Sequence, residues 1–211
     1  MKSVPFYPNH PDDMHCQMST YASVIDFFLG KKLSWEELEE LAGYRGGTTA
    51  WTVEALPKMA NMGLDIHMIE PVDYARYLKE GEKYLEELYA PEQIKWYREH
   101  SNIIEMKKFI PEFLKSIKQE SRQASLKDID DMLQAGRLVF VTVNSMLLNG
   151  HAGFASHAIL ILEKSGDEYI VHDPGLPPRP YRHIKQSDLW AAMGGESNTE
   201  EVTGFKLNTT R

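Results

Sequence analysis

The spacing of apolar positions predicts a helix close to the start of the chain. From Cys16 to Leu29 the sequence CQMSTYASVIDFFL has no glycine or proline, and its apolar residues recur every three or four positions. This spacing is typical of a helix with a wide buried face. The preceding residues 5–15 contain three prolines, an asparagine and two adjacent aspartates, which favour a loop. We therefore expect Cys16 in the first turn of a helix.

Two further helices and a short strand are expected next. Ser34 begins S-W-E-E, with Glu37 three positions on, and this capping box predicts a helix that ends near Gly43. Thr49 is a candidate cap for a third helix. The apolar alternation at residues 64–69, LDIHMI, predicts a strand after it.

Residues 71–124 differ in character from the rest. They are rich in Lys, Glu and Tyr with amphipathic spacing and without a strand-like run, so we expect two or three helices inserted as a subdomain. Most mixed-charge segments of this kind only face water. The alternative role is a lid or a partner-binding surface.

Strand patterns dominate the remaining sequence. Ser125 caps a predicted helix, the β-branched run LVFVTVNS follows it, and a glycine-rich loop comes next. SHAILILEK and DEYIVHD form a predicted hairpin across Ser165 and Gly166. YRHI and SDLWAAM predict a last strand and a last helix. Helices first and antiparallel strands last indicate an α+β fold, as one domain of residues 1–211 with 71–124 as a helical insertion.

Composition narrows the function classes. The 211 residues are 42% hydrophobic, which is enough for a substantial core without disulfides. A net charge of −8 disfavours nucleic acid and anionic lipid as partners. The first residues lack the apolar segment of a secretion signal, and no apolar run is long enough to cross a bilayer, so we expect a cytoplasmic protein. The single cysteine acts as a thiol, because it has no intramolecular disulfide partner.

The position of Cys16 suggests a nucleophile. Unpaired backbone N–H groups at a helix start favour negative charge, and a neighbouring imidazolium can lower a thiol pKa from about 8.5 to well below 7. A lone cysteine is more often buried packing. Whether Cys16 is a nucleophile or only packs in the core therefore depends on the candidate partners that could activate it.

His157 and Asp173 are these candidate partners. His157 opens the strand HAILIL and Asp173 ends the strand EYIVHD, so the hairpin should bring both to the same end of the sheet. A carboxylate there can accept a hydrogen bond from one ring nitrogen, while the other nitrogen faces a thiol. Either residue alone is more simply explained as structural.

These features together resemble a known family. Cys on an N-terminal helix, His opening a strand and Asp in a D-P turn sixteen residues later are similar to the papain-like bacteriocin-processing peptidases and their stand-alone relatives. The similarity covers residues 1–70 and 125–193, including F-Y-P, Y-A-S-V-I-D-F-F, L-x-x-L-A-G-Y, G-T-T, S-H-A-I-L-I and V-H-D-P-G. It implies a papain-type fold and acyl chemistry through a thioester, with Cys16, His157 and Asp173 as catalytic residues.

The resemblance also raises the question of the oxyanion donor. Family members usually carry Gly directly after the cysteine and Gln six residues before it, where this chain has Gln17 and His10. That glutamine donates a hydrogen bond to the oxyanion in the family pattern. Asn9 and His10 are the candidates to replace it here, together with the backbone N–H of Cys16.

A metal or cofactor is not expected. The histidines at 15, 151, 172 and 183, with Asp12 and Asp13, contain no pair spaced as H-x-x-x-H or H-E-x-x-H. His172 and Asp173 should point to opposite faces of their strand.

Three functions remain open from the sequence. The first is a cysteine peptidase or related amide hydrolase that acts on a peptide or small amide. The second is an acyl transferase that passes the same thioester to an amine. The third is a non-catalytic module on the same fold, with the helical insertion holding a peptide or protein.

Overall fold

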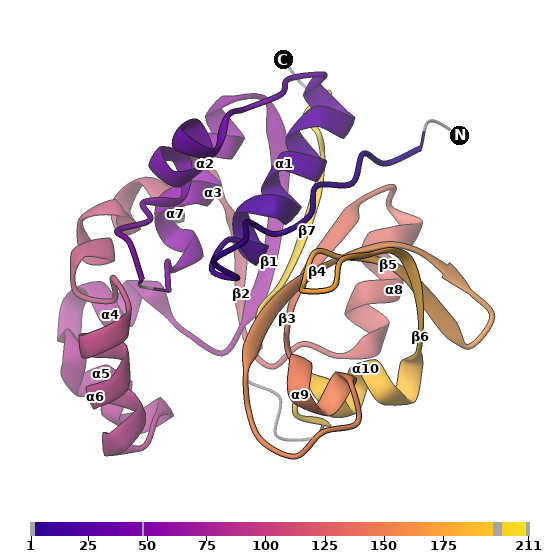
Figure 1. Ribbon diagram of the computed structural model, residues 1–211. Helices are drawn as coiled ribbons and strands as arrows, with labels where there is room; N and C mark the ends of the chain where they lie inside the picture. The colour runs from indigo at the N-terminus through magenta and orange to yellow at the C-terminus, as the bar shows by residue number, and fades with distance from the viewer. Residues whose placement is uncertain (1–2, 48, 196–199, 210–211) are drawn as a thin grey trace.

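The computed structural model describes residues 3–47, 49–195 and 200–209, and in this part of the chain a seven-stranded mixed sheet carries helices on both faces (Figure 1). The strand order is β2-β1-β7-β3-β4-β5-β6. The strands are β1 (Leu64–Glu70), β2 (Lys118–Ser121), β3 (Leu138–Asn144), β4 (Ser156–Ser165), β5 (Glu168–Asp173), β6 (Arg179–Lys185) and β7 (Val202–Leu207). The α+β class is thus confirmed.

The helices fall into two groups on either side of the sheet. The first group is α1 (Cys16–Leu29), α2 (Trp35–Ala42), α3 (Thr52–Asn61), α4 (Tyr74–Glu80), α5 (Glu82–Leu88), α6 (Pro91–His100), the 3₁₀ turn η1 (Glu105–Phe109) and α7 (Ile110–Ser116). The second group is α8 (Leu126–Gln134), α9 (Ser145–Leu148) and α10 (Gln186–Ala192). Figure 1 shows the two groups apart, with β3 and β4 between them.

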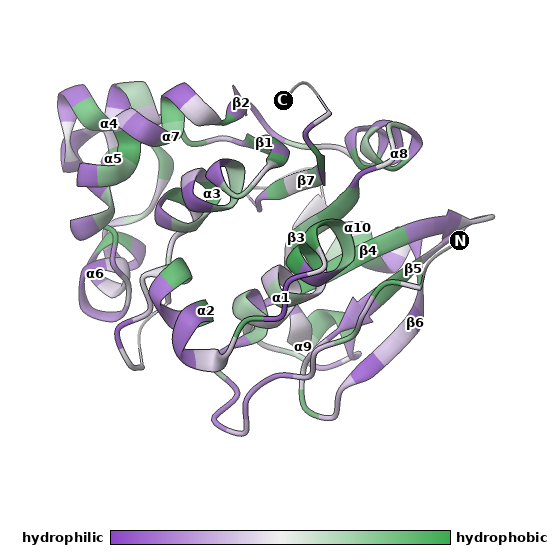
Figure 2. Ribbon diagram, turned by 90° about the horizontal axis from the view of Figure 1, so that it is seen from above, coloured by the Kyte–Doolittle hydropathy of each residue, from purple (hydrophilic) through white to green (hydrophobic). Residues whose placement is uncertain are grey.

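Two hydrophobic clusters hold these layers together. Phe140 and Leu160 belong to the cluster under α1 and α3, whereas Val141 and Ile159 belong to the cluster under α8 and α10. A strand that is covered on both faces has a continuous run of apolar residues. This explains the runs LVFV in β3 and AILIL in β4. The strong apolar colouring of β3 and β4 in Figure 2 reflects this double burial. Each fully buried Leu, Ile or Phe contributes about 1.5–3 kcal/mol relative to exposure.

Local sequence signals placed the starts of three helices as expected. Helix α1 begins at Cys16, and Ser34 and Ser125 each form a capping box at the start of α2 and α8. The expected cap at Thr49 is wrong, because α3 begins at Thr52 with Trp51 as its cap residue. Thr49 is instead in an extended bridge with Ser101.

The segment 71–124 contains a strand that the sequence did not predict. Lys118–Ser121 pairs in parallel with β1 at the edge of the sheet, so the expectation of helices alone is wrong. A short polar edge strand lacks the apolar alternation that identifies strands. The helices of this segment bury side chains such as Tyr77 and Phe113 in the same cluster as α1 and α3.

Strand β7 was also missed, although it joins the two halves of the sheet. It pairs antiparallel with β1 on one side and with β3 on the other. Ile69 and Val141 both pair with Val202, and Val143 pairs with His157 on β4. One end of the sheet therefore brings together the last residues of β1 and β3 and the first residues of β7 and β4.

Among the described residues, no helix combines the length and the apolar character that a bilayer crossing requires.

Candidate functional site

The structure brings Cys16, His157 and Asp173 together. The Cys16 thiol at the first residue of α1 is hydrogen-bonded to the His157 side chain. Nε2 of His157 lies 2.8 Å from Oδ1 of Asp173, which leaves Nδ1 as the ring nitrogen for the thiol. The three side chains form a continuous chain of contacts from sulfur to imidazole to carboxylate.

A β-bulge places His157 and Asp173 on the same face of the sheet. Near the hairpin turn Ser165 pairs with Glu168, and this register would put Asp173 opposite Leu160. The register shifts between residues 161 and 163, so that Leu160 pairs with His172 and the next position sets Asp173 opposite Ile159. His157 is two residues from Ile159 and shares its face, because side chains alternate along a strand.

The surroundings of Cys16 favour a thiolate. Burial raises the pKa of the thiol, but hydrogen bonds from His157 and from the backbone N–H groups of Ala158 and Gln17 outweigh it and lower the pKa below its usual value. Burial likewise lowers the pKa of His157, but its contacts with Asp173 and Cys16 raise that pKa to about 10. The arrangement therefore favours a thiolate and imidazolium pair at neutral pH.

Asp173 is itself firmly held. Its Oδ2 accepts a hydrogen bond from Nη1 of Arg182 at 2.7 Å, and its Oδ1 accepts one from the Gly175 N–H at 3.1 Å. Burial raises the pKa of the carboxyl, whereas His157, Arg182 and the Gly175 N–H lower it to about 2. The carboxylate thus stays ionised and orients the imidazole.

A cavity of about 210 Å³ opens beside the thiol. Cys16 and His157 line it, and so do four acidic residues, Asp13, Glu70, Glu200 and Glu201. Its aromatic lining consists of Tyr44, Trp51, Tyr89, Tyr97 and Phe140. A molecule that fills this space meets both the Cys16 thiol and the acidic groups.

Asn9 and His10 lie outside the described lining of this cavity. The Asn9 side chain organises the loop before α1: its Oδ1 accepts hydrogen bonds from the N–H groups of His10 and His15, and its Nδ2 donates to Asp13 at 2.8 Å. The His10 ring packs against His15 and Trp35. Gln17, which follows Cys16 in the chain, is the one side-chain amide in the described lining of the cavity.

Replacing Asn9 with alanine tests its role directly. Because three hydrogen bonds of a buried side chain are lost, we expect Asn9→Ala to lower the free energy of unfolding by about 2–3 kcal/mol, measured by urea denaturation. A donor to the oxyanion would instead cost about 10²–10³-fold in kcat with little change in stability. Full stability together with such a kcat loss would contradict the structural role.

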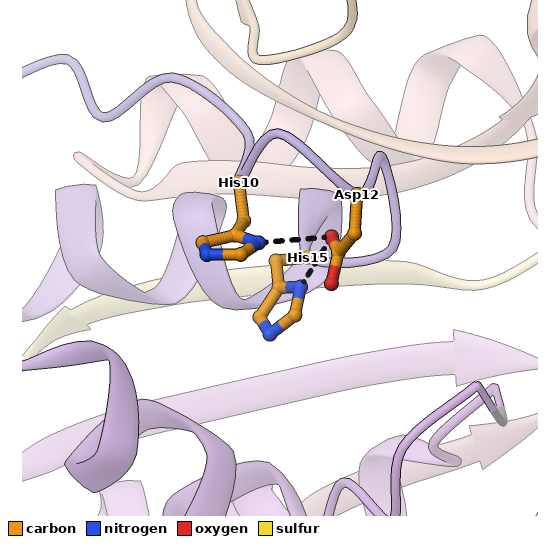
Figure 3. Close-up of side chains that lie close together, drawn as sticks. All are labelled: His10, Asp12 and His15. Atoms are coloured by element: carbon orange, nitrogen blue, oxygen red, sulfur yellow. Dashed lines mark hydrogen bonds and ion pairs between the residues drawn. The ribbon is translucent and has the colours of Figure 1, made fainter.

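His10, Asp12 and His15 form the one group that could hold a metal ion among the described residues (Figure 3). One ligand atom from each lies within 4.8 Å of the others. Nδ1 of His15 is 2.9 Å from Asp12, and its Nε2 is 2.8 Å from Glu39. Both ring nitrogens are therefore engaged, and a metal bound by His15 would have to replace one of these two contacts. His10 was not among the candidate ligands named from the sequence.

The remaining histidines are separate from this group. His172 contacts the Val4 carbonyl oxygen at 3.0 Å through Nε2, His183 contacts Glu168, and His151 is exposed in the loop before β4. The side chains of His172 and Asp173 point to opposite faces of β5, because successive side chains alternate along a strand.

The three glutamates of the cavity, Glu70, Glu200 and Glu201, are the functional candidates that sequence reasoning missed. Ile69 pairs with Val202, so the next register position sets Glu70 opposite Glu201. Burial raises the pKa of Glu201 to about 7, although hydrogen bonds from Thr203 and Thr52 lower it. Glu70 follows an apolar strand and Glu201 precedes one, but only the pairing of β1 with β7 brings them together.

Comparisons with known proteins place this chain in no family: it matches no protein-family model, and no curated protein is significantly similar to it.

Proposed function

We propose that this chain is a papain-like cysteine hydrolase that cleaves a peptide or small amide bond through a thioester. The observation that carries the proposal is the hydrogen-bonded series from Cys16 through His157 to Asp173. A cysteine whose pKa is lowered by an imidazolium is the activated nucleophile of such enzymes. The cavity beside the sulfur supplies room for a substrate.

The reaction follows from the positions of these groups. The Cys16 thiolate attacks the substrate carbonyl carbon, and the resulting oxyanion lies near the N–H groups at the start of α1, including that of Cys16. His157 gives its proton to the leaving amine as the C–N bond breaks, which leaves a thioester. Neutral His157 then takes a proton from water, the hydroxide attacks the thioester, and the thiolate leaves. The net change is hydrolysis of one amide bond.

The contact between thiol and imidazole supports a catalytic protein over a binding module. A module that had lost catalysis has no need to hold the thiol against His157 beside a cavity. Acyl transfer to an amine uses the same steps with the amine in place of water, and pocket shape decides between the two acceptors.

Alkylation with iodoacetamide tests the proposal. Because the thiol pKa is lowered, we expect Cys16 to react at pH 7 at least about ten times faster than the same cysteine in the urea-unfolded chain. Cys16 is the only cysteine, so the mass increase of the intact protein reports its modification alone. A rate in the folded protein no faster than that in the unfolded chain would refute the proposed function.

A further inference from the structure

We propose that the acidic part of the cavity binds an alkylammonium or guanidinium group of the substrate whose carbonyl Cys16 attacks. This inference rests on the proposed function for the attack itself, but the binding of a cation can be tested separately. It would make the protein selective for substrates with a lysine-like or arginine-like side chain.

Glu70 is the strongest observation in favour of a cationic ligand. Its side chain lines the cavity, the residue is 5% exposed, and its Oε1 has no hydrogen-bond partner. The neighbouring Tyr74 hydroxyl interacts with the Glu70 carboxyl and lowers its pKa, but by less than burial raises it. A buried carboxylate without a positively charged partner is costly, so such a group indicates a binding site for a cation or a bound proton.

The described side chains that line the cavity with Glu70 include further carboxyl groups and no lysine or arginine. Glu201 lies opposite it across β1 and β7, and Glu200 lines the same cavity. His157 in this lining is already paired with Asp173. Like charges placed opposite each other on paired strands destabilise a sheet. A cation in this space would relieve that repulsion.

The aromatic side chains of the cavity suit the same ligand. Trp51 and Tyr97 pack edge to face with ring centroids 5.4 Å apart, and Tyr89 packs against Tyr97 at 5.2 Å. Aromatic faces attract ammonium and guanidinium groups, and they also cover the alkyl chain that carries the charge. Tyr89 and Tyr97 belong to the segment 71–124, which therefore contributes to the binding space rather than only to the surface.

The proposal also explains an unfavourable feature of the cavity. Burial and the charge of Glu201 raise the pKa of Glu70 well above its usual value. The folded protein then holds this proton to higher pH than the unfolded chain does, so the carboxyl destabilises the fold once the pH exceeds its ordinary pKa. Proteins keep destabilising groups chiefly where function needs them.

Two alkylating probes of equal length provide the test: N-(4-aminobutyl)iodoacetamide, which is cationic, and neutral N-pentyliodoacetamide. We expect the cationic probe to alkylate Cys16 of the wild-type protein about tenfold faster or more, and Glu70→Gln to bring the ratio of the two rates close to one. The matched control Glu86→Gln, an exposed carboxylate on α5, should keep the wild-type ratio. A wild-type ratio of one or less, or an unchanged ratio in Glu70→Gln, would overturn the proposal.

The intrinsic reactivity of Cys16 cancels in this ratio. If plain iodoacetamide reacts no faster than with a free thiol, the proposed function fails, while the ratio still decides whether the cavity prefers a cation. Should Glu70→Gln not fold, protection of the wild-type protein gives the answer: n-butylguanidinium should slow labelling by iodoacetamide, and n-butanol at the same concentration should not. Equal protection by both compounds would count against a cation site.

Thermal unfolding adds an independent readout. We expect Glu70→Gln to melt at a higher temperature than the wild-type protein at pH 8, because the variant no longer buries an ionising carboxyl, and to lose this advantage at pH 4. A variant that melts lower at pH 8 would identify Glu70 as a structural partner and overturn the proposal.

Discussion

Replacement of His157 by alanine is expected to lower amide hydrolysis by about 10³–10⁴-fold. The variant loses both the proton carrier and the positive charge that keeps the Cys16 thiol ionised. Without this charge, burial dominates and the pKa of the thiol rises. The iodoacetamide rate measured against pH should therefore show a midpoint below that of a free thiol for the wild-type protein and above it for His157→Ala.

The His151→Ala variant is the matched control for this experiment. His151 is exposed in the loop before β4, so its loss should leave the pH profile of alkylation unchanged. Circular dichroism and thermal unfolding establish that both variants are folded. An identical pH profile for wild-type protein and His157→Ala would show that His157 does not activate Cys16.

Replacement of Asp173 is expected to have the next largest effect. Asp173→Ala frees the imidazole to rotate and removes the main contact that raises the pKa of His157, so we expect kcat to fall by about 10²-fold or more. Asp173→Asn should retain more activity, because an amide oxygen can still accept the hydrogen bond from Nε2.

The pH dependence separates orientation from charge. The pair of thiolate and imidazolium lasts only up to the pKa of His157, which is about 10 in the wild-type protein. Without the Asp173 charge this pKa falls, so the alkaline limit of activity should move to lower pH in both variants. The exposed Asp167 on the same hairpin gives the control variant Asp167→Asn. An unchanged alkaline limit in Asp173→Ala would contradict the assigned role.

Features set by neighbouring residues were predictable from the sequence. The start of α1 at Cys16, and the capping boxes at Ser34 and Ser125, depend on side chains within a few positions of one another. Thr49 was misassigned because its backbone pairs with residues 100–102, far along the chain. From the sequence alone, a threonine that caps a helix cannot be distinguished from one whose backbone pairs with a distant segment.

The parts of the sheet that depend on distant pairing were not predictable. Strand β7 contains Gly204, which weakens a strand signal, yet a Cβ at this position would meet Arg137 at 2.7 Å and Met132 at 2.8 Å. The same limit applies to the cavity, since Glu70 and Glu201 become neighbours only through β7. The hairpin predicted from the sequence places His157 and Asp173 at the same end of the sheet. Their side chains share a face only because of a β-bulge, and this bulge has no clear sequence signature.

The walls of the cavity come from separate stretches of the chain. Cys16 and His157 belong to stretches outside 71–124, whereas Tyr89 and Tyr97 come from within that segment. Changes in the segment can therefore alter which molecules fit the cavity while Cys16 and His157 keep their setting. The shape of the cavity and the thiol–imidazole pair are in this sense separately adjustable parts of one protein.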